Sequence, residues 1–215
     1  MAELTIAIAK GRLQISTLEL LTKAGLLPDN DFSSSRRLAI EDELGRFRFI
    51  FVKPMDVPVY VEHGVADCGI VGRDVLMESN PDLLQPLKLD IGKCQIVSAA
   101  PNGMIRNAHG MLRVATKYPH LAAGYFGMRG QPVEIIELSG SVELAPVLGL
   151  AECIVDLVET GQTLRDNGLS IVDVIAESTA RLVVNRASYQ LKAKAVGALI
   201  TSLEACASKG GRTGD

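Results

Sequence analysis

An α/β fold with mainly parallel sheets, divided into two lobes with a cleft between them, is the fold class that this 215-residue sequence predicts. Short apolar runs of strand length alternate along the chain with segments whose apolar residues have helical spacing, the order typical of parallel sheets covered by helices. The chain contains more such segments than one small sheet needs, which favours two lobes. Clefts of this kind suit ligands that bind at the carboxyl ends of strands.

The chain begins with a continuous apolar run over residues 4–9, which predicts a buried strand. After the interruption Lys10-Gly11-Arg12, leucines at helical spacing predict a helix over residues 13–26, with a glycine near its C-terminal end. Residues 29–37 are polar and are expected to form a loop.

Alternating phenylalanines over residues 47–51 predict the next strand. Asp56 is placed to cap a helix that ends at Gly64, because short polar side chains favour the start of a helix and glycine its end. A second apolar run, over residues 68–71, predicts another buried strand, and a helix is expected over residues 73–77.

The second half of the chain repeats this order and ends in a helix. Short apolar runs predict strands over residues 96–99, 112–115, 133–138, 153–158, 171–175 and 181–184. Helices are expected over residues 119–128, 142–150 and 163–167 and around the fourfold-spaced Leu191, Ala195, Leu199 and Leu203. We expect residues 1–91 and 176–208 to form a discontinuous first lobe, residues 92–175 a second lobe, and residues 209–215 a polar tail.

The composition excludes several classes of function. Lys and Arg number 22 against 25 Asp and Glu, a formal charge of −3, so a nucleic-acid binder is not expected. No stretch approaches the roughly 20 apolar residues that span a bilayer, and the N-terminus lacks the charge order of a secretory signal, so a cytoplasmic protein is expected. The four cysteines and three histidines show no metal-ligand spacing, and none is assigned a metal or catalytic role.

The segment over residues 153–164, CIVDLVETGQTL, carries the most chemical information. A buried strand ends near Asp156, and Thr160, Gly161, Gln162 and Thr163 then open a helix. Unpaired backbone N–H groups, hydroxyl donors and a glycine that permits close approach together favour a bound phosphate. Asp156 is placed to accept hydrogen bonds from ribose hydroxyls, so a 5-phosphoribosyl group fits. A plain capped helix after a strand is the alternative.

Residues 143–164, ELAPVLGLAECIVDLVETGQTL, resemble the signature of the ATP phosphoribosyltransferases of histidine biosynthesis. The segments AIAKGRL near the N-terminus, RRL over residues 36–38 and DVPVYVEHGVADCGIVGRDVL over residues 56–76 are also similar to that family. The chain stops after its last helix and resembles the short form, which has no C-terminal regulatory domain. The resemblance implies a fold like that of type II periplasmic binding proteins.

The resemblance also implies a reaction. Members of the family transfer the 5-phosphoribosyl group of phosphoribosyl diphosphate to N1 of ATP and release pyrophosphate, the first step of L-histidine biosynthesis. Mg²⁺ would be held mainly by the substrate phosphates. Short-form members work with a regulatory subunit similar to histidyl-tRNA synthetase. A homo-oligomer, a dimer, within a larger hetero-oligomer is therefore expected.

Cationic side chains are expected to neutralise the polyphosphates. Lys10 and Arg12, beside Gly11 at a strand-to-helix turn, are assigned as catalytic contacts to pyrophosphate or triphosphate, with a solvated helix start as the alternative. Arg37 is the third cation, and Arg36 can take its place; Lys53 is weaker. Glu143 is assigned to the ribose or adenine side of the substrates, although a carboxylate at the start of a helix needs no such role.

Two other functions compete with this interpretation. A cytosolic two-lobed binding or sensing domain would use the cleft without turnover, but a binder of small neutral solutes needs neither the TGxT loop nor the cationic turn. A type I phosphoribosyltransferase acting on a free base has a similar loop on another fold. Such an enzyme carries two adjacent acidic residues before the loop, whereas Val155 precedes Asp156 here.

Overall fold

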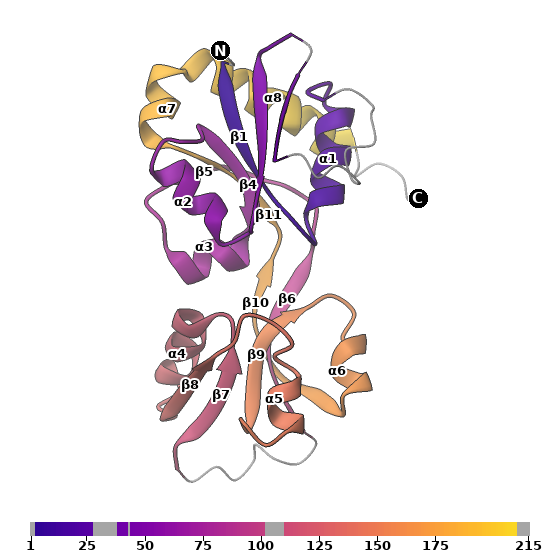
Figure 1. Cartoon of the computed structure of the whole chain (residues 1–215), viewed down its shortest axis with the longest axis vertical. Coiled ribbons are helices and arrows are strands. Elements are labelled where there is room, and N and C mark those ends of the chain that lie inside the picture. Colours follow the sequence, from indigo (N-terminus) through magenta and orange to yellow (C-terminus); the bar gives the residue numbers. More distant parts are fainter. Residues whose placement is uncertain (1–2, 28–37, 43, 102–109, 210–215) are drawn as a thin grey trace. The chain divides into compact units, whose positions relative to one another are not determined.

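A computed structural model describes residues 3–27, 38–42, 44–101 and 110–209. The chain forms two compact units, and each is built around its own sheet (Figure 1). Unit 1 contains residues 1–92 and 179–215, and unit 2 contains residues 93–178. Unit 2 is thus continuous in sequence, whereas unit 1 is assembled from both ends of the chain.

The sheet of unit 1 has six strands in the order β2-β3-β1-β4-β11-β5. Its strands are β1 (Leu4–Ala9), β2 (Ala39–Glu41), β3 (Phe47–Val52), β4 (Cys68–Gly72), β5 (Leu84–Lys88) and β11 (Ala180–Val184). The central strand β1 is parallel to β3 and β4, so the carboxyl ends of these three strands meet at one edge of the sheet. The outer strands β2, β11 and β5 pair antiparallel to their neighbours.

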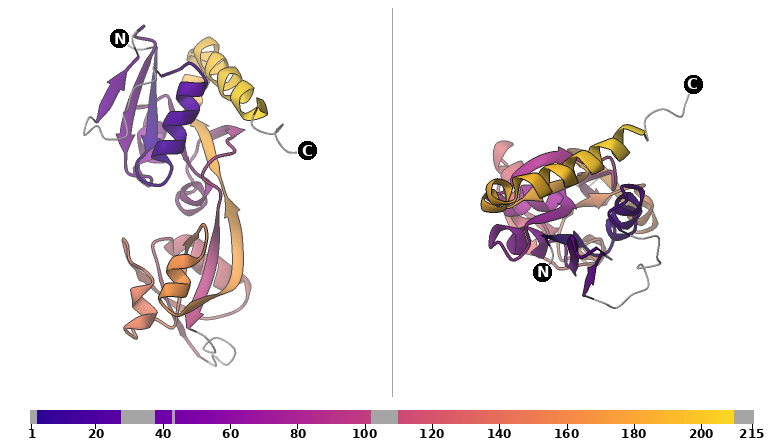
Figure 2. Two further views of the ribbon diagram at one scale, coloured as in Figure 1. Left: turned by 90° about the vertical axis from the view of Figure 1, so that its right-hand side faces the viewer. Right: turned by 90° about the horizontal axis from the view of Figure 1, so that it is seen from above.

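Helices cover both faces of this sheet because β1 is apolar on both sides. Its leucine and isoleucines face α1 (Gln14–Lys23) and α8 (Ala193–Lys209), and this larger core contains Leu4, Ile6, Ile8, Leu21, Leu182, Leu199 and Leu203 (Figure 2). Its alanines face the smaller core beneath α2 (Asp56–Glu62) and α3 (Arg73–Ser79). Gly69 of β4 permits this close packing, because a Cβ there would lie 2.7 Å from Val57 Cγ1.

The C-terminal helices are attached to the sheet through the buried carboxylate of Asp67. This carboxylate accepts hydrogen bonds from the Thr5 amide (2.8 Å), the Ser188 hydroxyl (2.7 Å) and the Lys192 ammonium (2.8 Å). Ser188 belongs to α7 (Arg186–Leu191), and Lys192 immediately precedes α8. Burial alone would raise the pKa of Asp67, but these hydrogen bonds outweigh it and hold the pKa below its ordinary value.

The sheet of unit 2 has five strands in the order β10-β6-β9-β7-β8. They are β6 (Cys94–Pro101), β7 (Leu112–Thr116), β8 (Val133–Glu137), β9 (Cys153–Val158) and β10 (Leu169–Ser178). The strands β8, β7 and β9 are parallel, and β6 and β10 are antiparallel additions. The helices are α4 (Pro119–Met128), α5 (Leu144–Val147) and α6 (Gln162–Asp166). One core lies between the sheet and the segments that contain α5 and α6.

The expected α/β class is confirmed, and so are the strands over residues 4–9 and 153–158. Each sheet is mixed, however, and the parallel pairing is confined to strands joined through helical crossovers. The helix expected over residues 142–150 is reduced to α5, because Gly149 with a φ of +75° ends it early. Asp56 does not cap α2 but lies in its first turn, after an N-cap residue whose side chain makes no capping hydrogen bond.

The polar loop expected over residues 29–37, which includes Arg36 and Arg37, lies entirely outside the described residues. Among the helices that the structure describes, none has both the length and the apolar character needed to cross a bilayer.

Candidate functional site

The parallel strands of unit 2 place the predicted phosphate loop at one edge of the sheet. β9 ends at Val158, and residues 159–161 connect it to α6. Gly161 is the N-cap of α6, is buried, and has a φ of +73°, a conformation that favours glycine. The Thr160 hydroxyl lies 3.4 Å from the Gln162 amide, and Thr163 is exposed. The loop therefore presents backbone N–H groups and hydroxyls at the carboxyl end of a strand, as expected of a phosphate site.

The side chain of Gln162 contacts its own helix. Its side-chain amide donates to Asp166 Oδ1 at 2.6 Å, and its carbonyl oxygen accepts from Arg165 Nη2 at 3.0 Å. These bonds lie along α6 itself, so the side chain stabilises the short helix. Its backbone N–H remains part of the loop.

Asp156 lies in β9 beside a cation that sequence reasoning missed. Its Oδ1 is buried and lies 3.2 Å from the ammonium nitrogen of Lys117, which follows the last residue of β7. The contact is ionic only: among the described residues, no donor meets this oxygen in hydrogen-bonding geometry. A carboxylate oxygen that has an ion-pair partner and no hydrogen bond can still accept one, and a ligand hydroxyl can supply the donor.

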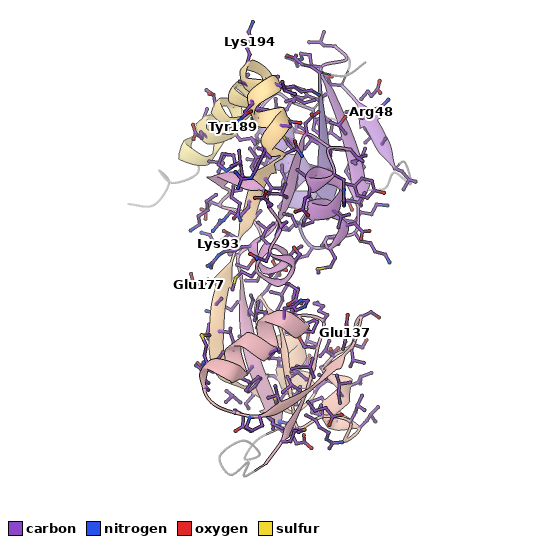
Figure 3. All side chains as sticks on the ribbon, turned by 90° about the vertical axis from the view of Figure 1, so that its left-hand side faces the viewer. Arg48, Lys93, Glu137, Glu177, Tyr189 and Lys194 are labelled. Atoms are coloured by element: carbon purple, nitrogen blue, oxygen red, sulfur yellow. The ribbon has the colours of Figure 1, made fainter. Side chains whose placement is uncertain are left out.

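Thr116 fixes the positions of these two residues. Its buried hydroxyl donates to the Val155 carbonyl at 2.7 Å and accepts from the Tyr118 amide at 2.9 Å. The first bond joins β7 to β9 one residue before Asp156, and the second shapes the turn that contains Lys117. Thr116 also pairs with Glu137, the last residue of β8, which Figure 3 labels.

Glu143 lies in the segment that connects β8 to β9. It is the N-cap residue of α5, but its side chain makes no capping hydrogen bond. Two residues earlier, Ser141 has a φ of +47°, which is uncommon for a residue other than glycine and occurs preferentially at functional loops. Lys117, Asp156 and the TGxT loop thus lie toward the carboxyl ends of the neighbouring strands β7 and β9, and Glu143 lies in the connection from β8 to β9.

In unit 1, basic residues follow the parallel strands β1, β3 and β4. Lys10 comes after β1, Lys53 after β3 and Arg73 after β4. The Lys10 amide continues the pairing by donating to the Val52 carbonyl at 2.8 Å, so Lys10 and Lys53 lie at the same edge of the sheet. The sequence predicts Arg73 only as the start of a helix. Its position directly after a parallel strand is the feature that could have identified it as a candidate binding residue.

Arg12 contacts the segment that leads out of unit 1. Its Nη1 donates to the Gly92 carbonyl at 2.8 Å, and its Nη2 lies 3.8 Å from Asp74 Oδ1. Gly92 has a φ of +61°, and a Cβ at this position would clash with Leu13. The N-terminal turn is therefore packed against the last residue before unit 2.

The buried thiols do not fit a nucleophilic role. Burial raises the pKa of Cys153 and of Cys68 to about 12, so both remain protonated near neutral pH. Over the described ranges, no group of three or more His, Cys, Asp or Glu side chains comes together as metal ligands.

Comparisons with known proteins show which family the chain is similar to. Residues 53–205 match the protein family described as ATP phosphoribosyltransferase (HisG). The chain is 51% identical over 200 residues to the ATP phosphoribosyltransferase of Geobacillus sp. (strain WCH70), which covers 93% of this chain and 97% of that one. It is 48% identical over 205 residues to that of Geobacter metallireducens, covering 94% and 97% of the two chains.

Solved structures are similar as well. A chain of the ATP phosphoribosyl transferase (HisG:HisZ) complex from Thermotoga maritima superimposes with a TM-score of 0.84 at 37% identity, covering 96% of this chain and 99% of that one. The periplasmic aliphatic sulphonate binding protein SsuA from Escherichia coli is 11% identical, with a TM-score of 0.61 over 95% of this chain and 72% of that one. The second likeness shows a shared two-lobed fold.

Proposed function

This chain belongs to the ATP phosphoribosyltransferase family, and on that premise we propose how its residues perform the transfer. The enzyme joins N1 of ATP to C1 of phosphoribosyl diphosphate and releases pyrophosphate, the first step of L-histidine biosynthesis. The observation that carries the assignment of the site is the buried Asp156 oxygen without a hydrogen-bond donor. Asp156 lies near the end of β9, shortly before the loop that contains Gly161.

The edge of unit 2 takes the phosphoribosyl group. The backbone N–H groups of Gly161, Gln162 and Thr163 and the hydroxyls of Thr160 and Thr163 hold the 5-phosphate. The carboxylate oxygen Oδ1 of Asp156 accepts hydrogen bonds from the ribose hydroxyls. Glu143, beside the strained Ser141, contacts the ribose or adenine side of the substrates.

The edge of unit 1 takes polyphosphate. Lys10 and Lys53 follow adjacent parallel strands, and Arg12 is oriented by its bond to the Gly92 carbonyl. These cations stabilise the triphosphate of ATP and the negative charge that develops on the departing pyrophosphate. Arg37 is proposed as a further cation of this set.

No side-chain nucleophile is needed, because N1 of adenine carries its own lone pair. The rate enhancement then comes from positioning two polyanions, which is worth roughly 7–11 kcal/mol of the barrier. Each preorganised donor aimed at the leaving group adds about 3 kcal/mol. Mg²⁺, held mainly by phosphate oxygens and water, neutralises part of the diphosphate charge when bound.

The solved relative from Thermotoga maritima is part of a HisG:HisZ complex, and we propose the same kind of assembly for this chain. The partner is a regulatory subunit similar to histidyl-tRNA synthetase, and the catalytic chain forms a dimer within the larger hetero-oligomer. A cytoplasmic location fits an enzyme whose substrates are ATP and phosphoribosyl diphosphate.

Ultraviolet absorbance tests the reaction directly, because alkylation of N1 changes the purine spectrum. The chain, alone and with its partner, is mixed with ATP, phosphoribosyl diphosphate and Mg²⁺, and parallel samples contain adenine in place of ATP. A spectral change is expected in the samples that contain ATP and not in those that contain adenine. A change with adenine but not with ATP would identify a phosphoribosyltransferase for free bases, and binding without any change would identify a passive binding domain.

A further inference from the structure

The ion pair between Lys117 and Asp156 joins an accessible ammonium to a carboxylate with one buried oxygen. The side chain of Lys117 is 37% exposed and that of Asp156 is 19% exposed, so a ligand can reach the ammonium. Within the described part of the chain, the Lys117 ammonium contacts Asp156 and lies 5.5 Å from the centroid of the Tyr118 ring. The ammonium therefore has donors to offer.

The covalent structure of phosphoribosyl diphosphate determines which of its groups lies next to Asp156. In phosphoribosyl diphosphate, the carbon of the 2-hydroxyl adjoins C1, which carries the diphosphate. A carboxylate that accepts from the hydroxyls therefore has the diphosphate beside it. The loop after β9 lies on one side of Asp156 along the strand, and Lys117 of the neighbouring β7 segment lies on another.

We propose that Lys117 is a substrate-binding residue that contacts the diphosphate of phosphoribosyl diphosphate. Before the substrate binds, Asp156 holds the ammonium at the edge of the sheet. When the ribose hydroxyls donate to the buried oxygen of Asp156, the ammonium turns to the phosphate oxygens. Lysine suits this exchange because its charge is compact and its stem is flexible, and a lysine binds phosphate as a point charge. The assignment rests on the proposed function.

Binding of two fragments of the substrate tests this role without turnover. Inorganic pyrophosphate with Mg²⁺ and ribose 5-phosphate are titrated separately into the wild type, Lys117→Met and Lys117→Arg by calorimetry. For Lys117→Met, pyrophosphate affinity is expected to fall by about tenfold or more, while ribose 5-phosphate affinity changes by less than about twofold. Lys117→Arg keeps the charge and is expected to retain most of the pyrophosphate affinity. Lys117→Gln repeats the test if the methionine variant melts early.

Arg113→Gln is the matched control. Arg113 lies at the other end of β7, where its Nε donates to Glu152 at 2.9 Å, so the variant removes one positive charge and one ion pair from the same strand. Its affinity for pyrophosphate is expected to equal that of the wild type.

Two results would overturn the assignment. Unchanged pyrophosphate affinity in Lys117→Met would remove Lys117 from the diphosphate site. An effect of Lys117→Met that disappears in the Asp156→Asn background would show that Lys117 acts only by positioning Asp156. Both are distinct from failure of the proposed function, in which the wild type forms no product from ATP and phosphoribosyl diphosphate.

Discussion

Gly161 is the residue on which the conformation of the phosphate loop most depends. An added Cβ would lie 3.1 Å from Arg165 Nη1, a contact that the flexible arginine can relieve, but the φ of +73° remains strained for any other residue. Gly161→Ala is expected to lower stability by about 1 kcal/mol and to weaken ribose 5-phosphate binding by about tenfold.

Gly168→Ala is the control for Gly161→Ala in calorimetry and thermal melting. Gly168, after the other end of α6, has a φ of +70° and open space around its Cα. It is expected to lose the same stability and to keep its affinity. Equal weakening of binding in both variants would show that the effect comes from α6 as a whole.

Asp156→Asn should separate the role of the carboxylate charge from that of its shape. The amide retains an oxygen near the buried position but loses the charge that binds the ribose hydroxyls strongly and holds Lys117. The value of kcat/KM at limiting phosphoribosyl diphosphate is expected to fall about tenfold or more, which corresponds to about 1.4 kcal/mol. Steady-state kinetics with each substrate varied in turn measures this, and an equal loss for ATP would argue against a ribose contact.

Residues with a motif around them could be identified from the sequence, whereas those that depend on strand pairing could not. Asp156 and Gly161 are recognisable because a strand, an acidic residue and TGxT follow one another within a short segment. Lys117 and Arg73 are single basic residues after short apolar runs. Only the parallel pairing of β7 with β9, and of β4 with β1, places them beside the candidate sites.

Elements with strong local patterns were predicted well. The uninterrupted apolar runs of β1 and β9 mark buried parallel strands, and both were found with their observed bounds. The helix α7 was not predicted, although the sequence contains its capping residue. Asn185 is the N-cap, and its side chain accepts hydrogen bonds from the amides of Ala187 and Ser188. β2 has only three residues, and β5 (LQPLK) contains a proline and two polar residues, so neither shows a strand pattern in the sequence; pairing with β3 and β11 defines them.

The attachment of α7 and α8 depends on Asp67, and Asp67→Asn is expected to destabilise unit 1 by about 2 kcal/mol near neutral pH. Since the folded pKa of Asp67 lies below its ordinary value of 3.8, its contribution is fully present above that pH. It is lost as the pH falls through the folded pKa. The difference in unfolding free energy between wild type and variant should therefore shrink on acidification, as measured by urea unfolding between about pH 6 and 3.

Asp82→Asn tests whether loss of any ion pair to α7 lowers the stability as much as Asp67→Asn does. Asp82 accepts from Arg186 at 2.8 Å, but the side chains are 71% and 61% exposed. Little loss of stability is expected from this variant. A loss as large as that of Asp67→Asn would assign the effect to α7 docking in general rather than to the buried carboxylate.

For the whole molecule, feedback control requires a second site whose ligand distinguishes two states of the enzyme. The solved relative that covers nearly the same length as this chain belongs to a complex with a second protein. We therefore expect the isolated chain to be active and insensitive to histidine, with inhibition only after the synthetase-like partner is added. Activity titrated with histidine, with and without that partner, measures this. Strong inhibition at micromolar histidine without the partner would place a regulatory site within these 215 residues.

The position of β11 between β4 and β5 has a consequence for how the protein is made. A ribosome releases β1 to β5 first, yet their sheet lacks the strand that joins β4 to β5 until residues 180–184 emerge. The whole of unit 2 is synthesised in that interval, and all of its strands are consecutive. Nascent chains of increasing length should therefore acquire protease resistance in unit 2 before unit 1, so the domain that begins second is completed first.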